Sequence, residues 1–188
     1  EQLLDGIIDI AVHSMKDMPI AQPDGLVLDT YLPREDVRDA FVSPSTDSIA
    51  SLTQGARVGS SSLRRRAQLM HVRPDLDVVE FRGNVQTRLK KLAEGVASCT
   101  FLAMAGLNRL NMAHIATLAI EPEDMLPAVA QGAIGIERRS NDSVTAALLE
   151  PLHHAGTGQR LAAERAFLAA LDGSCETPIA GLATLECS

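Results

Sequence analysis

The sequence predicts an α/β fold in which strands alternate with helices. Three strand-to-helix units follow one another between residues 57 and 110, and each has a short apolar run, a turn and an amphipathic segment. Such alternation is typical of βαβ units, so we expect a largely parallel sheet there. The chain has 188 residues, of which 46% are hydrophobic and 22% charged, enough for one large domain or two small ones.

Composition narrows the classes of function. The net charge is −7 and only 3% of the residues are aromatic, which argues against nucleic acid as a partner, because such proteins present basic surfaces or stacking platforms. No apolar run reaches the roughly 18 residues of a membrane span, so we expect no membrane association. The cysteines, Cys99, Cys175 and Cys187, form no CxxC pair and no cluster with histidine at metal spacing. We therefore expect no metal site and a reducing compartment, the cytoplasm.

The strands are expected where short apolar runs meet turn residues. A charged connection, Pro33 to Asp39, separates two of these runs and is a candidate hinge between domains. The runs that we interpret as strands are residues 9–12, 26–28, 40–42, 57–59, 77–81, 101–104 and 133–137.

Helices are expected where apolar residues recur at helical spacing. The first ends near Val72, the third follows Ala105-Gly106, the fourth covers 143–152 with Ser143 as its cap, and the last covers about 159–171 after the Gly156-Thr157-Gly158 break. The predicted packing faces are Leu63, Ala67 and Met70; Val85, Leu89 and Leu92; Leu107 and Leu110; and Ala162, Ala166 and Ala169.

The first candidate site follows the strand at 57–59. Gly59 lets the chain turn, Ser60, Ser61 and Ser62 can cap a helix start, and Arg64 and Arg65 add two guanidinium groups to its first turn. A helix start of this kind favours anions through its free N–H groups and its dipole. The alternative is an ordinary capped helix with solvated arginines.

A second candidate site repeats this pattern at the end of the next strand. Arg82, Gly83 and Asn84 precede a helix that carries Arg88, and Arg109 stands near the start of the third helix. Ligands of parallel α/β sheets bind outside the carboxyl ends of the strands, so together these arginines indicate a ligand with several carboxylates or phosphates. Arginine outnumbers lysine 14 to 3, which suits bidentate anion binding, although a GC-rich genome gives the same bias.

Two further positions could carry chemistry. Asp17 follows the first strand together with His13, Ser14 and Lys16, and among arginines it would stay ionised and could stabilise a developing cation; alternatively it only forms a turn. Cys175 lies between a helix end and a proline and could be a nucleophile or a covalent anchor, or an inert buried thiol. A helix carboxyl end raises a thiol pKa, which argues against a fast nucleophile and permits a permanent thioether.

Seven stretches in order resemble the porphobilinogen deaminase (hydroxymethylbilane synthase) family of tetrapyrrole biosynthesis. Single matches would be weak, but the ordered set is specific. The stretches are residues 9–19 (DIAVHSMKDMP), 34–41 (REDVRDAF), 59–65 (GSSSLRR), 81–89 (FRGNVQTRL), 102–107 (LAMAGL), 131–133 (QGA), and Cys175 followed by Pro178-Ile179.

The resemblance implies three α/β domains, of which the first two are built like type-II periplasmic binding proteins. The first domain would comprise residues 1–34 and 130–150, the second 37–127, and an incomplete third α+β domain 155–188. The family's N-terminal segment has no counterpart here, so we expect a chain truncated at both ends that by itself folds poorly and is inactive.

The resemblance also implies a reaction and a cofactor. The family's members are typically monomers that join four porphobilinogen molecules head-to-tail onto a covalent dipyrromethane, with loss of one ammonia at each addition. Hydrolysis by water then releases the four added rings as hydroxymethylbilane, and the dipyrromethane stays on the protein. Cys175 matches the thioether anchor. Asp17, with Lys16, matches the catalytic position and would stabilise the cation formed as ammonia leaves. Cofactor contacts match Ser14, Lys16, Asp17, Ser60, Ser61, Ser62, Arg64, Arg65, Arg82, Gly83 and Arg88, and substrate contacts match Arg82, Arg88 and Arg109.

A different function class fits part of this pattern. A non-catalytic module of periplasmic-binding-protein type for a polycarboxylate or phosphate needs the arginines but neither Asp17 nor Cys175. Replacement of Asp17 by Asn distinguishes the two, because a binding module would keep its affinity whereas a deaminase would lose turnover.

Overall fold

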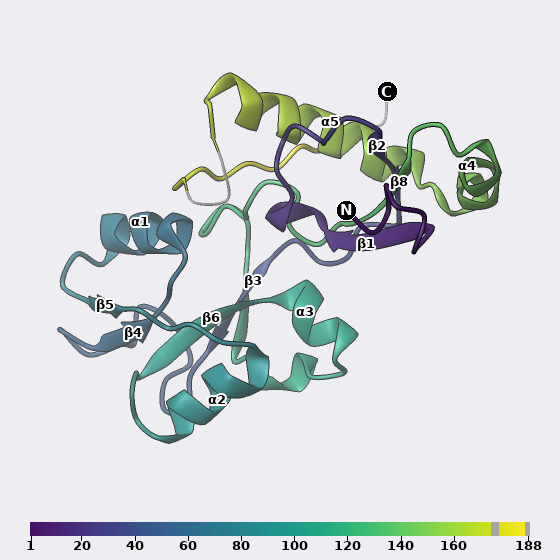
Figure 1. Ribbon diagram of the computed structural model, residues 1–188. Helices are drawn as coiled ribbons and strands as arrows, with labels where there is room; N and C mark the ends of the chain where they lie inside the picture. Colours follow the sequence, from purple (N-terminus) through teal and green to yellow (C-terminus); the bar gives the residue numbers. More distant parts are fainter. Residues whose placement is uncertain (174–176, 187–188) are drawn as a thin grey trace. The chain divides into compact units, whose positions relative to one another are not determined.

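The structure, a computed structural model, describes residues 1–173 and 177–186, and these residues form two compact units (Figure 1). The chain passes from the first unit to the second within the charged connection 33–39. The first unit comprises the described residues of Glu1–Glu35, Ala128–Cys175 and Gly181–Ser188, and the second those of Asp36–Pro127 and Glu176–Ala180.

The first unit contains a three-stranded antiparallel sheet in which β8 lies between β1 and β2. Its elements are β1 (Ile10–Ser14), the 3-10 helix η1 (Met15–Asp17), β2 (Leu26–Tyr31), β8 (Ile134–Arg139), α4 (Ser143–Leu149), the 3-10 helix η3 (Glu150–Leu152) and α5 (Ala155–Ala170). Helix α5 packs against β2. In register, Val12 of β1 faces Ile136 of β8.

The second unit contains a five-stranded mixed sheet in the order β5-β4-β6-β3-β7. Its elements are β3 (Asp39–Val42), β4 (Arg57–Gly59), α1 (Leu63–Val72), β5 (Asp77–Val79), α2 (Val85–Ala93), β6 (Cys99–Ala103), α3 (Met104–Arg109), the 3-10 helix η2 (Ala113–Ile115) and β7 (Leu118–Ile120). Strand β3 runs opposite to β6, so its first residue, Asp39, pairs with Ala103 at the carboxyl end of β6.

The sheet of the second unit is buried on both faces. Phe41 and Phe101 lie opposite each other with ring centroids 5.9 Å apart, and they share one core layer with Leu69 of α1. Their strand neighbours point to the other face and pack with Leu92 of α2 and Leu107 of α3. Figure 1 shows α1 on one side of this sheet and α2 and α3 on the other. The alternation along each strand, which has a period of two residues, produces the two layers.

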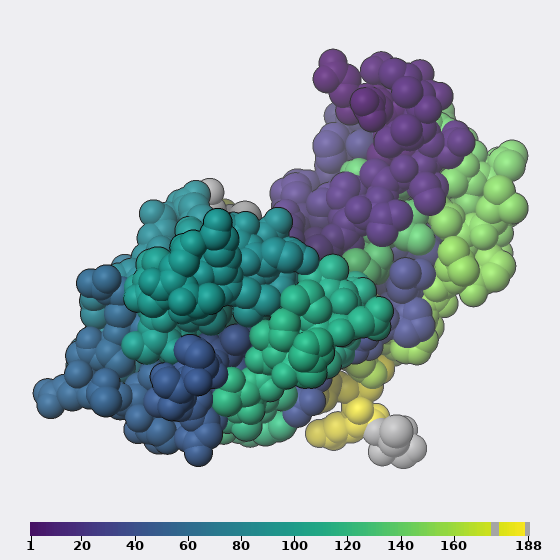
Figure 2. All heavy atoms as spheres, turned by 90° about the horizontal axis from the view of Figure 1, so that it is seen from below, coloured from purple at the N-terminus to yellow at the C-terminus, as the bar shows by residue number. Residues whose placement is uncertain are grey.

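The N-terminal segment lies on the surface of the first unit, as the purple atoms of Figure 2 show. Ile7 and Val12 are more than half exposed. Arg139 holds the segment by donating to the carbonyls of Leu3 and Ile8 and by pairing with Asp9, and the Leu3 side chain is buried. None of the helices in residues 1–173 and 177–186 is long and apolar enough to cross a membrane.

The α/β fold class is confirmed, but the sheets are not largely parallel. Among the described strands, β4 pairs in parallel with β5 and with β6, whereas β3, β7 and all three strands of the first unit pair antiparallel. Parallel neighbours need a crossover connection, and α1 and α2 provide one only for β4, β5 and β6. The short strand β7 was not predicted from the sequence.

The predicted packing faces of two helices were wrong, and in a third, α3, Leu107 is buried but Leu110 is exposed. In α1, Leu63 is half exposed, and the buried side chains are Arg64, Arg65 and Leu69. In α5, the three alanines at 162, 166 and 169 are exposed, and the buried stripe is Thr157, Leu161 and Glu164. In both helices the buried face carries charged groups that have partners inside the protein, a case that apolar periodicity does not detect.

Three helix starts also differ from expectation. Asp142 rather than Ser143 caps α4 by accepting from the Thr145 amide. Helix α5 begins at Ala155, since the His154 ring accepts from the amide of Thr157, so the two glycines there lie inside the helix. Helix α3 begins directly at Met104, without the expected turn.

Candidate functional site

One buried carboxylate organises the first predicted site, in the second unit. Asp39 is fully buried, and its two oxygens accept from different arginines: Oδ2 from Arg64 Nη2 and Oδ1 from Arg65 Nη2, both at 2.7 Å. The other terminal nitrogens bind main-chain carbonyls, Arg64 Nη1 to Leu126 at 2.7 Å and Arg65 Nη1 to Phe101 at 2.8 Å. Both guanidinium groups are thus held in fixed orientations, and they are not the solvated arginines of the alternative interpretation.

The charges of this cluster stabilise one another. Burial acts to raise the pKa of Asp39, but the charges and hydrogen bonds of Arg65 and Arg64 outweigh it and hold that pKa well below its usual range. Burial lowers the pKa of Arg64, and Asp39 counteracts this effect. The cluster therefore stays ionised at neutral pH.

Three serines lead from β4 into α1, and each accepts a backbone hydrogen bond. Ser60 Oγ accepts from the Ser62 amide at 3.3 Å, Ser61 Oγ from the Phe81 amide at 2.8 Å, and Ser62 Oγ caps the helix by accepting from the Arg65 amide at 3.4 Å. Among the described residues none of these hydroxyls donates a hydrogen bond, so each could donate its proton to a ligand that reaches it, although Ser60 is buried. Gly59 is required by packing rather than by a sharp turn, because a Cβ there would lie 2.5 Å from the Phe81 ring.

The second predicted site surrounds the start of α2. Asn84 caps the helix, with Oδ1 accepting from the Thr87 amide at 2.9 Å, and Gly83 has a φ of +128°. Arg88 Nε donates to the Gly83 carbonyl at 2.8 Å. Burial and the positive charge of Arg65 lower the pKa of Arg88, so these two arginines share one electrostatic environment.

The remaining two arginines differ from this group. Arg82 is 81% exposed and forms an ion pair with Glu80. Arg109 is the last residue of α3, not a residue near its start as predicted, because the helix begins at Met104 and is short. The structure thus brings together Arg64, Arg65 and Arg88, and leaves Arg82 on the surface.

The predicted catalytic residues lie in the first unit, where β1 ends. Ser14 is the last residue of β1, and Lys16 and the exposed Asp17 belong to η1. Arg165 of α5 fixes the chain just beyond, donating to the carbonyls of Met18, Pro19 and Ile20 at 3.4, 2.6 and 3.0 Å. The carboxylate of Asp17 is therefore presented to solvent from an anchored turn.

Cys175, the predicted anchor, lies outside the described residues. The buried Cys99 is a free thiol, and burial raises its pKa to about 12, which makes it a poor nucleophile. His153 and His154 have structural roles, since the first accepts from the Tyr31 amide and the second caps α5. Within residues 1–173 and 177–186 there is no group of three His, Cys, Asp or Glu side chains that could hold a metal.

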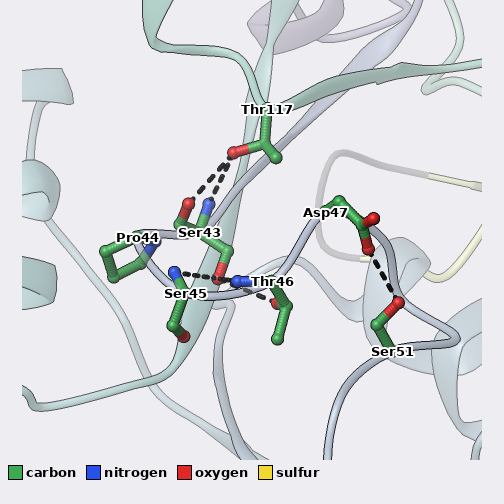
Figure 3. A pocket seen from close by; sticks show the side chains of 7 residues that line it. All are labelled: Ser43, Pro44, Ser45, Thr46, Asp47, Ser51 and Thr117. Carbon is green, nitrogen blue, oxygen red and sulfur yellow. Dashed lines mark hydrogen bonds between the residues drawn. The ribbon is translucent and has the colours of Figure 1, made fainter.

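An open pocket of about 610 Å³ lies elsewhere in the second unit (Figure 3). It begins at Ser43, directly after β3, where the register places the amino ends of β4 and β6. Its polar groups bind one another: the Thr117 hydroxyl donates to the main-chain carbonyl of Ser43, and the Ser51 hydroxyl donates to the carboxylate of Asp47. The arginine cluster is at the opposite, carboxyl end of these strands, which is where α/β sheets bind ligands, so this pocket is not part of the predicted site.

Sequence reasoning missed Asp39 and Glu164. The sequence shows Asp39 as the end of a charged connection, although an ionisable residue at the start of an apolar strand can indicate a buried ion pair. Glu164 lies in α5, where the spacing of the alanines predicts that a different face of the helix is buried. Its carboxylate accepts from Arg34 at 2.6 and 3.0 Å and from the Ala130 amide at 2.6 Å.

Comparison with known proteins decides the family. The family model described as porphobilinogen deaminase, dipyrromethane cofactor binding domain, matches residues 1–147, and the model of the C-terminal domain of the same enzyme matches residues 159–188. This chain belongs to the porphobilinogen deaminase family. The resemblance seen in the sequence is thereby confirmed, including the cofactor-binding domain.

Curated porphobilinogen deaminases match almost the whole chain. The enzyme of Paracoccus denitrificans is 68% identical over 99% of this chain and 59% of its own length, and the chloroplastic enzyme of Pisum sativum is 57% identical over 99% of this chain and 51% of its own length. The chain thus spans between half and three fifths of the length of these two relatives.

Solved structures support the fold expected for this deaminase family. A Bacillus subtilis protein described as a methionine-binding lipoprotein matches 83% of this chain and 74% of its own chain with a TM-score of 0.52 and 15% identity. The periplasmic aliphatic sulphonate binding protein of Escherichia coli matches 91% of this chain and 56% of its own, with a TM-score of 0.50 and 13% identity. At these identities the likeness concerns the fold alone, which is periplasmic-binding-protein-like as predicted.

Proposed function

We propose that the protein carrying this chain is a transferase that deaminates four porphobilinogen molecules and joins them head-to-tail on a covalent dipyrromethane, releasing hydroxymethylbilane. The observation that carries this proposal is the 68% identity to a curated porphobilinogen deaminase over 99% of the chain. The buried arginines support it, because each pyrrole ring of the substrate bears two carboxylates, and guanidinium groups bind carboxylates through paired, charge-assisted hydrogen bonds.

The residues present fit the dipyrromethane. Arg64 and Arg65 each have a buried Nε without a partner among the described residues, and Arg88 adds positive charge beside them, so acidic side chains of the cofactor would satisfy donors that the protein leaves open. When bound, the group supplies the carbon to which the first substrate ring is joined. We propose that Cys175 holds it as a thioether, with contacts from Ser14, Lys16, Asp17, Ser60, Ser61, Ser62, Arg64, Arg65, Arg82, Gly83 and Arg88.

Asp17 is proposed as the catalytic carboxylate, with Lys16 beside it. As the aminomethyl group of porphobilinogen loses ammonia, positive charge develops on the substrate, and a fixed carboxylate stabilises that charge. The anchored turn at Met18 to Ile20 limits the reorganisation of Asp17 during the step. Arg82, Arg88 and Arg109 are proposed to bind the acetate and propionate groups of the incoming ring.

The proposal also covers the domain limits, the cellular location and the oligomeric state of the protein. We place the first domain at residues 1–34 and 130–150, the second at 37–127, and the start of a third at 155–188. The C-terminal family model at 159–188 supports the last of these, although α5 packs on β2 of the first unit. The unpaired, buried Cys99 supports a reducing compartment, and we propose a cytoplasmic monomer without nucleic-acid or membrane partners.

The test is turnover by the full natural polypeptide that carries this sequence. Purified protein supplied with porphobilinogen should consume it, as followed with Ehrlich's reagent, and should release ammonia. Intact-mass analysis should show an adduct confined to the peptide that holds Cys175. Asp17→Asn should lower kcat about 100-fold or more while the Cys175 adduct still forms.

Asp24→Asn is the matched control, because Asp24 is also an exposed carboxylate in a loop of the first unit, and its turnover should equal that of the unaltered protein. An unmodified Cys175 in folded, active protein would contradict the cofactor assignment. Full activity of Asp17→Asn would remove Asp17 from catalysis, and anion binding without any consumption of porphobilinogen would favour a binding module.

A further inference from the structure

The turn that carries Asp17 is fixed at two points, one on either side of this residue. The β1 ladder ends at Ser14, and the next residue, Met15, is 1% exposed and its amide donates to the Ala133 carbonyl at 3.0 Å. A Cβ on Gly135 of β8 would clash with the Met15 side chain, so this glycine provides the space in which that side chain is buried. The chain therefore enters the turn from a buried, closely packed residue.

Beyond Asp17, a side chain of α5 fixes the turn. The guanidinium of Arg165 donates to three successive main-chain carbonyls: Nη1 to Met18 at 3.4 Å, and Nη2 to Pro19 at 2.6 Å and to Ile20 at 3.0 Å. Proline has no amide hydrogen, so this stretch has one backbone donor fewer with which to stabilise itself. The rigid fork of an arginine supplies donors in fixed directions, and it therefore sets the course of the chain that leaves the turn.

We propose that Arg165 is a positioning residue for the reaction, which holds the chain at Met18 to Ile20 and thereby fixes the carboxylate of Asp17. Arg165 lies in residues 159–188, which match the C-terminal domain model, whereas Asp17 lies in residues 1–147, which match the cofactor-binding domain model. The C-terminal domain thus completes the catalytic turn of the cofactor-binding domain, in addition to carrying Cys175. The inference rests on the proposed function in so far as Asp17 is the catalytic carboxylate.

The position of Asp17 matters because its proposed task is electrostatic. A carboxylate stabilises a developing cation best when its place is set before the charge appears, and a displacement of about 1 Å can cost as much as about 100-fold in rate. Asp17 is exposed and lies beyond the end of the β1 ladder, so its backbone depends on the two fixed points. Loss of Arg165 releases one of them while Met15 retains the other, which predicts a mobile turn in a folded protein.

The experiment compares Arg165→Met with the unaltered full polypeptide. Methionine keeps an apolar stem but removes the guanidinium. The kcat for porphobilinogen consumption, taken per folded molecule that carries the Cys175 adduct, should fall about 10- to 100-fold. The KM should stay within about twofold, because the arginines proposed to bind the substrate are unaltered and the lost interaction acts on the transition state. Intact-mass analysis should still show the adduct, which separates this loss from a loss of cofactor.

Arg160→Met is the matched control, because Arg160 belongs to the same helix whereas the hydrogen bonds to the turn come from Arg165. Its kcat and KM should stay within about twofold of the unaltered values. Arg165→Lys separates the fork from the charge: one ammonium group cannot span three carbonyls as the fork does, so kcat should remain at least about threefold low. Full activity of folded Arg165→Met or Arg165→Lys, an equal loss in Arg160→Met, or a raised KM at constant kcat would overturn the proposal.

A second measurement needs no turnover. NMR relaxation should give the backbone amides of Lys16 and Asp17 order parameters of about 0.85 in the unaltered protein, as in rigid backbone, and below about 0.6 in Arg165→Met. Values below about 0.6 in the unaltered protein would overturn the proposal even if Arg165→Met fails to fold. Absence of turnover in the unaltered protein would contradict the proposed function only, since the order parameters would still decide whether Arg165 holds the turn.

Discussion

Glu164 shows at the scale of one residue how the first unit is held together. Its carboxylate accepts from the guanidinium of Arg34, from the Ala130 amide and from the Ala183 amide at 2.9 Å. Both side chains of the ion pair are at most 3% exposed. Ala130 also has a positive φ of 62°, a conformation that costs free energy in a residue with a Cβ and that the bond to Glu164 helps to stabilise.

We therefore expect Glu164→Gln to destabilise the protein strongly. The variant leaves the Arg34 charge buried without its counter-charge, and breaking a buried pair by neutralising one partner costs about 3–5 kcal/mol. The free energy of unfolding from urea titration measures this loss. Asp77→Asn is the control, because the Arg57–Asp77 pair is more than half exposed on both sides and its removal should cost less than about 1 kcal/mol. Equal effects of the two variants would refute the argument.

At the scale of the element, side-chain hydrogen bonds fix the start of helix α2 in the second unit. The side chain of Asn84 satisfies both the amide and the hydroxyl of Thr87, at 2.9 and 2.8 Å. The adjacent Gly83 must remain glycine, because its φ is +128° and a Cβ would lie 2.7 Å from the Thr87 side chain. The cap and the glycine together determine the direction in which the chain enters α2.

Asn84→Ala should destabilise α2 by about 1 kcal/mol, the usual value of a lost N-terminal cap. Hydrogen exchange of the Thr87 amide should accelerate, since its acceptor is removed, and this can be followed by NMR together with the unfolding free energy. Asn84→Asp keeps an acceptor oxygen and adds a charge favourable at a helix start, so its Thr87 amide should stay protected. Rapid exchange in Asn84→Asp as well would show that the cap does not hold this turn.

Local turn chemistry explains how much of the fold and the site was predictable. Strand β4 and the end of α1 were predicted correctly, because glycine, serines and apolar runs act on adjacent residues. The buried faces of α1 and α5 were not, because Arg64, Arg65 and Glu164 enter the interior only through partners far along the chain, Asp39 and Arg34. Periodicity counts apolar residues and has no way to identify a buried charge whose partner lies in another element.

The strands of the first unit were predicted, but their antiparallel pairing was not, for a similar reason. Strand β8 pairs with β1 and β2, although the main segment of the second unit lies between β2 and β8 in the sequence. The short apolar runs do not indicate which distant strand each of them pairs with. The proposed functional residues follow from the family resemblance and from the polar clusters at strand ends, whereas the buried ion pairs of Asp39 are evident only in the structure.

At the scale of the molecule, the second unit has the features of an independent folding unit. Apart from a few residues of 176–180, it is one continuous segment, 36–127. It has its own sheet with a core layer on each face, and Arg64 and Arg65 bind Asp39 and the carbonyls of Leu126 and Phe101, all inside the segment. The first unit, by contrast, is assembled from segments on both sides of it.

We expect residues 36–127, produced alone, to fold cooperatively. Because the strands, both core layers and the buried ion pairs are all encoded within this segment, circular dichroism should show mixed α/β content with a single thermal transition, and the Phe101 amide should resist hydrogen exchange. Phe101→Ala in the same segment should lower the free energy of unfolding by about 3–5 kcal/mol, the cost of a cavity in a packed core. If the isolated segment shows no cooperative transition, or if Phe101→Ala leaves it unchanged, the unit depends on the rest of the chain. The geometry of the Asp39–Arg64–Arg65 cluster would then be a property of the whole protein and not of this unit.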